Sequence, residues 1–423
     1  MRQRRWWGLA LTALAVGFIA WFTLRPAPED ISAVARTPFL CLYGCGEQEL
    51  RDTVLNIALF VPLGFALARW LPGWVAILLC VAATCGIEFT QWGWLEGRDA
   101  SLRDLLFNSL GGALGVWLAH GWRRVFLPSI PVAARLSAGA ALGWLGLVGL
   151  TALGVQPSLP ETTWWGQWTP ELGQFEQWRG TLLDADVNGV AVPNGQAATT
   201  GELRLRLRRD PAVVTARIRT GPAPIRLAPI VSIFDGEERE VFVLGQRGPD
   251  LFFRIRTGLF VAGLRGPLVR FPDALALPPG ELVIVRGGIV DRGWQLQVST
   301  ATATRTWSTR WSAGLLWTGF LPFTYLMGRE VPILNALWLG AMLLPMGYWL
   351  GRATDRRRAS LWLVLIVGLG LGLLAPLAGL SASPPLEWLG SLLGGAAGLA
   401  AGAATARRGP VASSGPLVTS TPT

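Results

Sequence analysis

The chain has 423 residues, of which 51% are hydrophobic and 15% are charged, and its mean hydropathy is +0.41. This composition excludes an ordinary soluble protein and predicts a membrane protein. The net charge of +10 comes entirely from arginine, and much of it lies at the ends of apolar segments, where it sets membrane orientation rather than binding nucleic acid.

Five apolar segments in the first 155 residues are predicted to be membrane helices. The first follows three arginines, and we expect a retained anchor because the residues after it form a poor cleavage site. Pro62 is expected to kink the second helix. The segments cover residues 6–24, 53–70, 74–89, 105–119 and 133–153.

Polar residues at the ends of the second, third and fourth helices carry the functional argument. Glu88 and Gln91 are three residues apart and share a helix face, as do Asp104 and Asn108, which are four apart. An ionisable group inside a span costs roughly 2.5 to 3.5 kcal/mol, so Glu88 should face a partner, water or lipid headgroups. The candidate binding residues are Asp52, Asn56, Glu88, Gln91, Arg98, Asp99, Asp104 and Asn108.

The placement of arginine predicts the orientation of the helices. With the N-terminal arginines in the cytoplasm, the loop after the first helix lies outside, and Arg123 and Arg124 lie inside. All candidate residues then lie at the outer ends of three helices, where we expect Glu88, Arg98, Asp104 and Asn108 to form one connected site near the outer surface. Cys41 and Cys45 in the first outer loop are candidates for a small disulfide ring.

Residues 156–310 have a different pattern, with short alternating apolar and polar runs between turn residues. This pattern is typical of an antiparallel β-sandwich, which the fifth helix would place outside the membrane. Residues 184–189 begin like a calcium-binding loop, but Gly195 stands where a bidentate Glu is needed, which favours an Asx turn. No cofactor is predicted, and calcium bound through another ligand set in the sandwich stays an alternative.

Three further apolar segments, residues 331–350, 361–380 and 386–404, return to the membrane. If residues 314–327, rich in Trp and Phe, form an interfacial helix rather than a span, the arginines at 352–358 stay in the cytoplasm and the chain has eight spans. The predicted domains are residues 1–155, 156–310 and 311–405, followed by a disordered cytoplasmic tail at 406–423.

A shift of 283 residues aligns residues 58–64 with 341–347 and residues 110–113 with 393–396. Most polar positions are lost in the second copy, and only Asp104, aligned with Glu387, keeps its charge. The alignment predicts a parallel duplication with one polar half and one scaffold half. Low-complexity Leu, Gly and Ala sequence is the alternative explanation.

The polar pattern of residues 52–115, D-x3-N-x5-P-x-G, E-x-x-Q, R-D and D-x3-N-x2-G-x2-G, resembles the VanZ-like family, named for an accessory protein of teicoplanin resistance. The resemblance implies a polytopic membrane protein of the bacterial cell envelope, with a link to antibiotic resistance but no settled reaction. Residues of about 331–405 would be a degenerate second copy. The matching positions are Asp52, Asn56, Pro62, Gly64, Glu88, Gln91, Arg98, Asp99, Asp104, Asn108, Gly111, Gly112 and Gly115.

Residues 228–258 resemble the LamG or concanavalin-A-like jelly roll. The resemblance rests on a strand ending in Phe234-Asp235-Gly236, a strand leading into Leu244-Gly245-Gln246, and a third over residues 251–257. It implies carbohydrate or protein binding, and an inert spacer is the alternative.

Three classes of function follow. The sequence favours a non-enzymatic envelope protein that binds an envelope glycan or a lipid-linked group at the outer polar residues. The second class is an outer-leaflet enzyme with Glu88 and Asp104 as an acid/base pair, and enzymatic activity stays undecided because no nucleophile, metal set or phosphate loop accompanies them. The third is a transporter or channel. The apolar inner halves of the spans argue against this class. The single histidine excludes a histidine-rich metal site.

Overall fold

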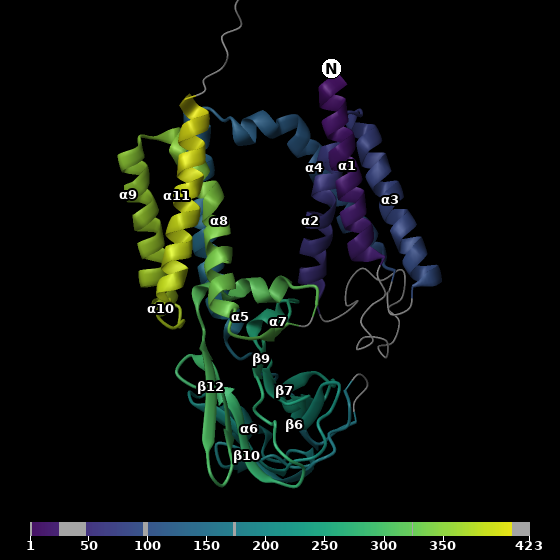
Figure 1. Cartoon of the computed structure of the whole chain (residues 1–423), viewed down its shortest axis with the longest axis vertical. Coiled ribbons are helices and arrows are strands. Elements are labelled where there is room, and N and C mark those ends of the chain that lie inside the picture. Colours follow the sequence, from purple (N-terminus) through teal and green to yellow (C-terminus); the bar gives the residue numbers. More distant parts are fainter. Residues whose placement is uncertain (1, 25–47, 96–99, 172–174, 324, 408–423) are drawn as a thin grey trace, which may run out of the picture.

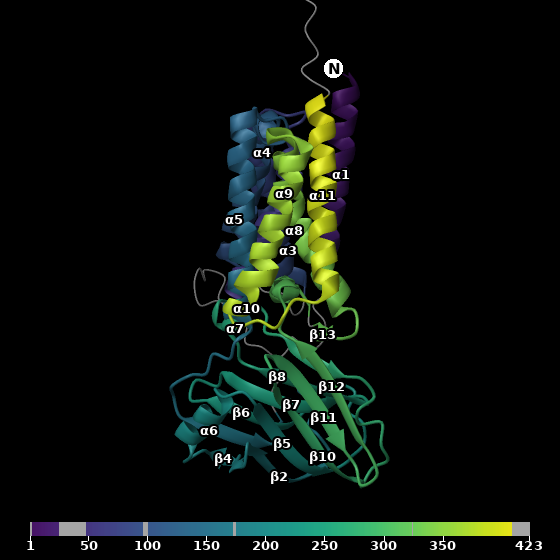
Figure 2. The same ribbon diagram turned by 90° about the vertical axis from the view of Figure 1, so that its left-hand side faces the viewer.

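The computed structural model describes residues 2–24, 48–95, 100–171, 175–323 and 325–407. In this part of the chain, two groups of helices stand side by side, and a β domain lies at one end of both (Figures 1 and 2). The first group is α1 (Arg2–Thr23), α2 (Glu49–Leu67), α3 (Gly73–Trp94) and α4 (Leu102–Phe126). The second is α5 (Ile130–Val155), α8 (Val331–Ala353), α9 (Arg356–Val367) with its continuation η3 (Gly368–Leu374) and α10 (Ala375–Leu377), and α11 (Pro385–Arg407).

Seven of the described helices are long and apolar enough to cross a membrane, which makes the chain a multi-pass membrane protein. The other predicted span, α4, is 25 residues long but carries more charge, and it packs extensively against α2. The helix α2 continues through Pro62. The segment expected to be interfacial contains the eight-residue 3-10 helix η2 (Ala313–Phe320), which is too short to cross a bilayer and lies buried between the helices and the β domain.

The described strands form two sheets that pack on each other around a shared core. Their orders are β13-β9-β8-β7-β6-β1-β4 and β12-β11-β10-β5-β2-β3, and the pairs are antiparallel except for β13 with β9. The strands are β1 (Trp164–Trp168), β2 (Thr181–Val187), β3 (Val190–Ala191), β4 (Gly195–Gln196), β5 (Ala212–Arg219), β6 (Ala228–Asp235), β7 (Glu240–Arg247), β8 (Asp250–Ile255), β9 (Leu268–Phe271), β10 (Leu282–Ile289), β11 (Gly293–Ser299), β12 (Thr304–Arg310) and β13 (Leu326–Met327), with the short helices α6 (Thr200–Leu207) and α7 (Gly258–Val261).

Two features of the β domain relate directly to the sequence predictions. The predicted hairpins over residues 228–257 are confirmed as β6, β7 and β8, which pair in sequence order. The domain also extends beyond the predicted boundary at residue 310, because β13 pairs with β9 after the chain has passed through η2. The β domain and the second helix group are therefore connected through η2 and β13, and not by a simple linker.

The acidic residues of the β domain are used in turns and ion pairs. Asp186 accepts a hydrogen bond from the Gly189 amide at 2.7 Å, three residues on rather than the two of an Asx turn, and Asp184 pairs with Arg217. Burial alone would raise the pKa of Asp235, but hydrogen bonds from Arg239 lower it below its ordinary value. Within the described ranges, no group of three or more His, Cys, Asp and Glu residues could hold a metal ion.

Glycines bring α2 against α4, and α8 against α11, in the same way. A Cβ added to Gly64 would lie 2.0 Å from the carbonyl oxygen of Gly112, and one added to Gly347 would lie 2.1 Å from that of Gly395. Each member of the second pair lies 283 residues after its counterpart. Three more contacts recur at this spacing: Gly111 on Ile57 with Gly394 on Gly340, Gly115 on Val61 with Gly398 on Leu344, and Gly112 on Cys80 with Gly395 on Leu363.

Adding a methyl group at either close contact should destabilise the protein. We expect Gly64→Ala and Gly347→Ala each to cost about 1–3 kcal/mol, because a backbone carbonyl cannot move aside as a flexible side chain can. Thermal unfolding of the purified protein in detergent measures this loss. Gly146→Ala in α5 is the control, since its added Cβ would meet nothing within 4 Å. Equal midpoints for Gly64→Ala and Gly146→Ala would contradict the role assigned to the α2–α4 contact.

Candidate functional site

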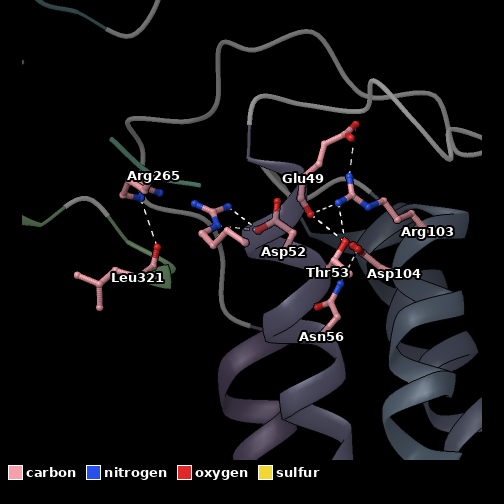
Figure 3. A network of polar contacts seen from close by, with 9 residues as sticks. Glu49, Asp52, Thr53, Asn56, Arg103, Asp104, Arg265 and Leu321 are labelled. Carbon is pink, nitrogen blue, oxygen red and sulfur yellow. Dashed lines mark hydrogen bonds and ion pairs between the residues drawn. The ribbon is translucent and has the colours of Figure 1, made fainter. Parts of the chain in front are cut away.

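Polar side chains of α2, α3 and α4 are connected at the helix ends that face the β domain, and Figure 3 shows those of α2 and α4. The Asn56 amide donates to Asp104 Oδ1 at 2.6 Å. The Asp104 backbone N–H donates to Ser101 Oγ at 3.0 Å, and the Ser101 N–H donates to Glu88 Oε2 at 2.8 Å. Asp52 lies one turn before Asn56 on the same face of α2. We call these five residues the helix-end cluster, and the expected proximity of Glu88 and Asp104 is confirmed.

Asn108 and Gln91 make different contacts. Asn108 Nδ2 donates to Thr84 Oγ1 of α3 at 2.9 Å, and Gln91 Nε2 donates to the carbonyl oxygen of Thr23 in α1 at 3.0 Å. Both side chains are buried, with 3% and 7% of their surface exposed. They therefore tie the first helix group together, in the way that interhelical hydrogen bonds do in membrane proteins.

Some predicted residues fall outside the part of the chain that the structure describes. Arg98 and Asp99 precede the first described residue of α4, and Cys41 and Cys45 lie in the loop after α1. Residues 408–423 of the predicted tail are also outside the described ranges. The roles expected for these residues stay predictions.

Arg103 is a site residue that the sequence analysis missed. It is 8% exposed, and it donates to Thr53 Oγ1 at 2.7 Å and to the backbone carbonyl of Glu49 (Figure 3). Its guanidinium also lies 3.4 Å from the Glu49 carboxylate. Arg103 thus joins the start of α4 to the start of α2. Its neighbour Ser101 could have been found, because Ser-x-x-Asp is a helix N-cap pattern.

Among the described residues, two acidic side chains of the cluster have no ion-pair partner. Arg103 pairs with Glu49, and Arg51 pairs with Asp52 at 2.5 Å. Among the described residues, Asp104 and Glu88 have no cationic group within 4 Å. Glu88 is only 4% exposed, whereas Asp104 is half-buried and the Asp52 side chain is 44% exposed. Asp52 and Asp104 are therefore the carboxylates that a ligand can reach.

The β domain borders the helix-end cluster at the start of α2. The Arg51 backbone N–H donates to the Gly263 carbonyl at 3.0 Å, and Arg265 Nε donates to the Leu321 carbonyl at 3.3 Å (Figure 3). Burial and the positive charges of Arg51 and Arg254 lower the pKa of Arg265 to about 10, and Asp52 partly offsets this effect. The loop after α7 and the end of η2 thus lie beside the cluster.

Comparison with known proteins identifies the first helix group. Residues 12–125 match the VanZ/LLP1 family. This match runs from within α1 to the last turn of α4 and includes all five residues of the helix-end cluster. No curated protein and no solved structure matches the chain. Residues 12–125 are therefore a VanZ-like membrane region.

The N-cap of α4 should stabilise the protein measurably. We expect Ser101→Ala to cost about 0.5–2 kcal/mol, because the Asp104 N–H loses its acceptor, and Ser101→Gly to cost only about a few tenths. Thermal unfolding in detergent measures both. Ser109→Ala is the control, since Ser109 Oγ only donates to the Leu105 carbonyl within the same helix. A Ser101→Ala protein as stable as Ser109→Ala would exclude the capping role.

Proposed function

We propose that this VanZ-like membrane protein acts in the bacterial cell envelope by binding a lipid-linked or glycan group at the helix-end cluster. The proposal rests mainly on one observation, the accessible carboxylates of Asp52 and Asp104 beside the β domain. Headgroups and sugars of envelope components lie at this depth, and their hydroxyl and amide groups can donate to carboxylates. The expected partners are this group and the lipid bilayer.

The distribution of arginine supports placing the cluster on the outer side of the plasma membrane. Arg69, Arg123, Arg124 and Arg352 lie at or just beyond the helix ends remote from the β domain. The positive-inside rule assigns these ends to the cytoplasm. The start of α1 and the end of α11 lie at the same remote side, so both termini would be cytoplasmic and the β domain extracytoplasmic (Figure 1).

The burial and bonding of Glu88 argue against acid/base catalysis by this residue. Glu88 is almost fully buried and accepts a hydrogen bond from a backbone amide that fixes the start of α4. This contact gives it a structural role. One observation favours an enzyme as the second candidate, namely that Ser101 lies between the two acidic residues: its N–H donates to Glu88 Oε2, and its Oγ accepts from the Asp104 backbone N–H. Product formation from a lipid-linked substrate, abolished in Glu88→Gln, would support the enzyme.

The β domain would hold a glycan close to the helix-end cluster. Its two packed sheets and its hairpins β6 to β8 agree with the LamG or concanavalin-A-like resemblance. Its loop at Gly263 contacts the start of α2, so a glycan bound nearby would be close to Asp52. If the full chain in nanodiscs binds no envelope glycan at millimolar concentration, the β domain is a spacer.

The VanZ-like region suggests a test in living cells. In a heterologous Gram-positive host, we expect the wild-type chain to lower susceptibility to teicoplanin or to envelope stress. Asp104→Asn should remove most of this protection, because the half-buried carboxylate is lost while an amide of the same size remains.

The control is Asp355→Asn, which changes a carboxylate at the opposite end of the second helix group. All variants are compared at equal membrane levels. Equal protection by wild type and Asp104→Asn would show that the helix-end cluster only packs helices.

A further inference from the structure

The second helix group repeats the polar layer of the first at a constant spacing. The helices α8, α9 with its continuation, and α11 match α2, α3 and α4 when the first group is shifted by 283 residues. This shift also superimposes the glycine contacts. It places Asn335 at the position of Asp52, Glu387 at that of Asp104, and Ser391 at that of Asn108.

In the second group, the chain itself occupies this polar layer. The Gly314 backbone N–H of η2 donates to Glu387 Oε1 at 3.3 Å, and the Trp317 indole N–H donates to Asn335 Oδ1 at 2.7 Å. Asn335 Nδ2 in turn donates to Ser312 Oγ at 2.8 Å. Glu387 and Asn335 are 0% and 3% exposed, so η2 covers them completely. Two N–H groups of η2 thus donate hydrogen bonds to side chains on two different helices, Glu387 of α11 and Asn335 of α8.

In the first group, no described segment occupies the equivalent place. Asp52 is bonded to its neighbour Arg51 and Asp104 to Asn56, and neither carboxylate accepts a hydrogen bond from the described β domain. One turn further into the helices, Asn108 Oδ1 and Ser391 Oγ are both buried without a hydrogen-bond partner in the described structure. The same position thus carries a buried polar atom without a described partner in both groups.

The charges differ between the two layers in a way that selects the ligand. Where the second group has the amide of Asn335 and one buried carboxylate, the first has Asp52, which pairs with Arg51, and Asp104, which has no ion-pair partner among the described residues. The unpaired carboxylate of Asp104 would attract a cation and repel a phosphate. A ligand that replaces the N–H donors of η2 should therefore present N–H groups with positive charge.

We propose that the helix-end cluster binds an amino group, with N–H donors directed at Asp104 and Asp52, in the place that Gly314 and Trp317 occupy in the second helix group. This inference rests on the proposed function and specifies its ligand. Residues 312–317 are then an internal ligand, and the first group has no such segment over Asp104 and Asp52 in the part of the chain that the structure describes. The amino group can belong to a lipid headgroup or to a soluble peptide, which share this chemistry.

Binding of simple amphiphiles tests the inference. The full chain is reconstituted in phosphatidylcholine nanodiscs and titrated with dodecylamine, N-acetyldodecylamine and dodecyl phosphate. We expect dodecylamine to bind most tightly, and Asp104→Asn to weaken its binding about tenfold. Triglycine and N-acetyltriglycine, which have no alkyl chain, distinguish a soluble peptide source from a lipid source. If the natural ligand is a soluble peptide, triglycine should bind and N-acetyltriglycine should not; if it is a lipid headgroup, neither should bind.

Matched variants make the result decisive. Glu387→Gln should leave dodecylamine binding unchanged, because η2 covers this position. If Asp104→Asn does not fold, judged by its thermal midpoint, Asp52→Asn decides instead. Equal binding of amine and phosphate, or equal loss in Glu387→Gln and Asp104→Asn, would overturn the inference. If amine binding fails while Asp104 is still needed for protection in cells, the proposed function stands and this inference falls.

Discussion

The close approach of α2 and α4 at Gly64 and Gly112 is the constraint on which the site depends. Helices in a bilayer gain little from burying apolar surface against each other, so small residues that allow close backbone contact are a main source of association. At this contact a single methyl group would lie 2.0 Å from a carbonyl oxygen. The same approach lets the short side chains of Asn56 and Asp104 form a 2.6 Å hydrogen bond two turns away. The glycine contact between α2 and α4 therefore positions Asn56 and Asp104, whose short side chains can bond directly.

The two helix groups use one packing scheme for different purposes. In the second group, η2 donates to Glu387 and Asn335 and fixes the β domain to the helices. In the first, the β domain borders the cluster at the start of α2, where the Gly263 carbonyl accepts a hydrogen bond from the Arg51 N–H. One element of the chain thus completes one polar layer, and no described segment does the same for the other. Between the two layers, Asp52 stands where the second group has Asn335, whereas Asp104 and Glu387 both carry a carboxylate.

Much of this arrangement could be predicted from the sequence because it depends on local periodicity. Apolar runs predict the helices, and the spacing of Glu88 and Asp104 together with alternating orientation predicts that they meet. The contacts that could not be predicted involve distant backbone atoms. Arg103 donates to the backbone of Glu49, and β13 pairs with β9 only because η2 returns the chain to the sheet. Nor does the sequence show that η2 covers Asn335, since a Trp- and Phe-rich segment is equally compatible with lipid contact.

The central claim is that the polar layer of the first helix group is open to the outside, whereas the equivalent layer of the second group is closed. Cysteine labelling from one side of the membrane tests this claim most directly. In a background with the four native cysteines replaced, Asp52→Cys, Asn335→Cys and Arg69→Cys are exposed to a membrane-impermeant maleimide in intact cells. The account predicts that Asp52→Cys reacts, that Asn335→Cys reacts only after denaturation, and that Arg69→Cys reacts only after the membrane is permeabilised. Protection of Asp52→Cys, or reaction of Arg69→Cys in intact cells, would contradict it.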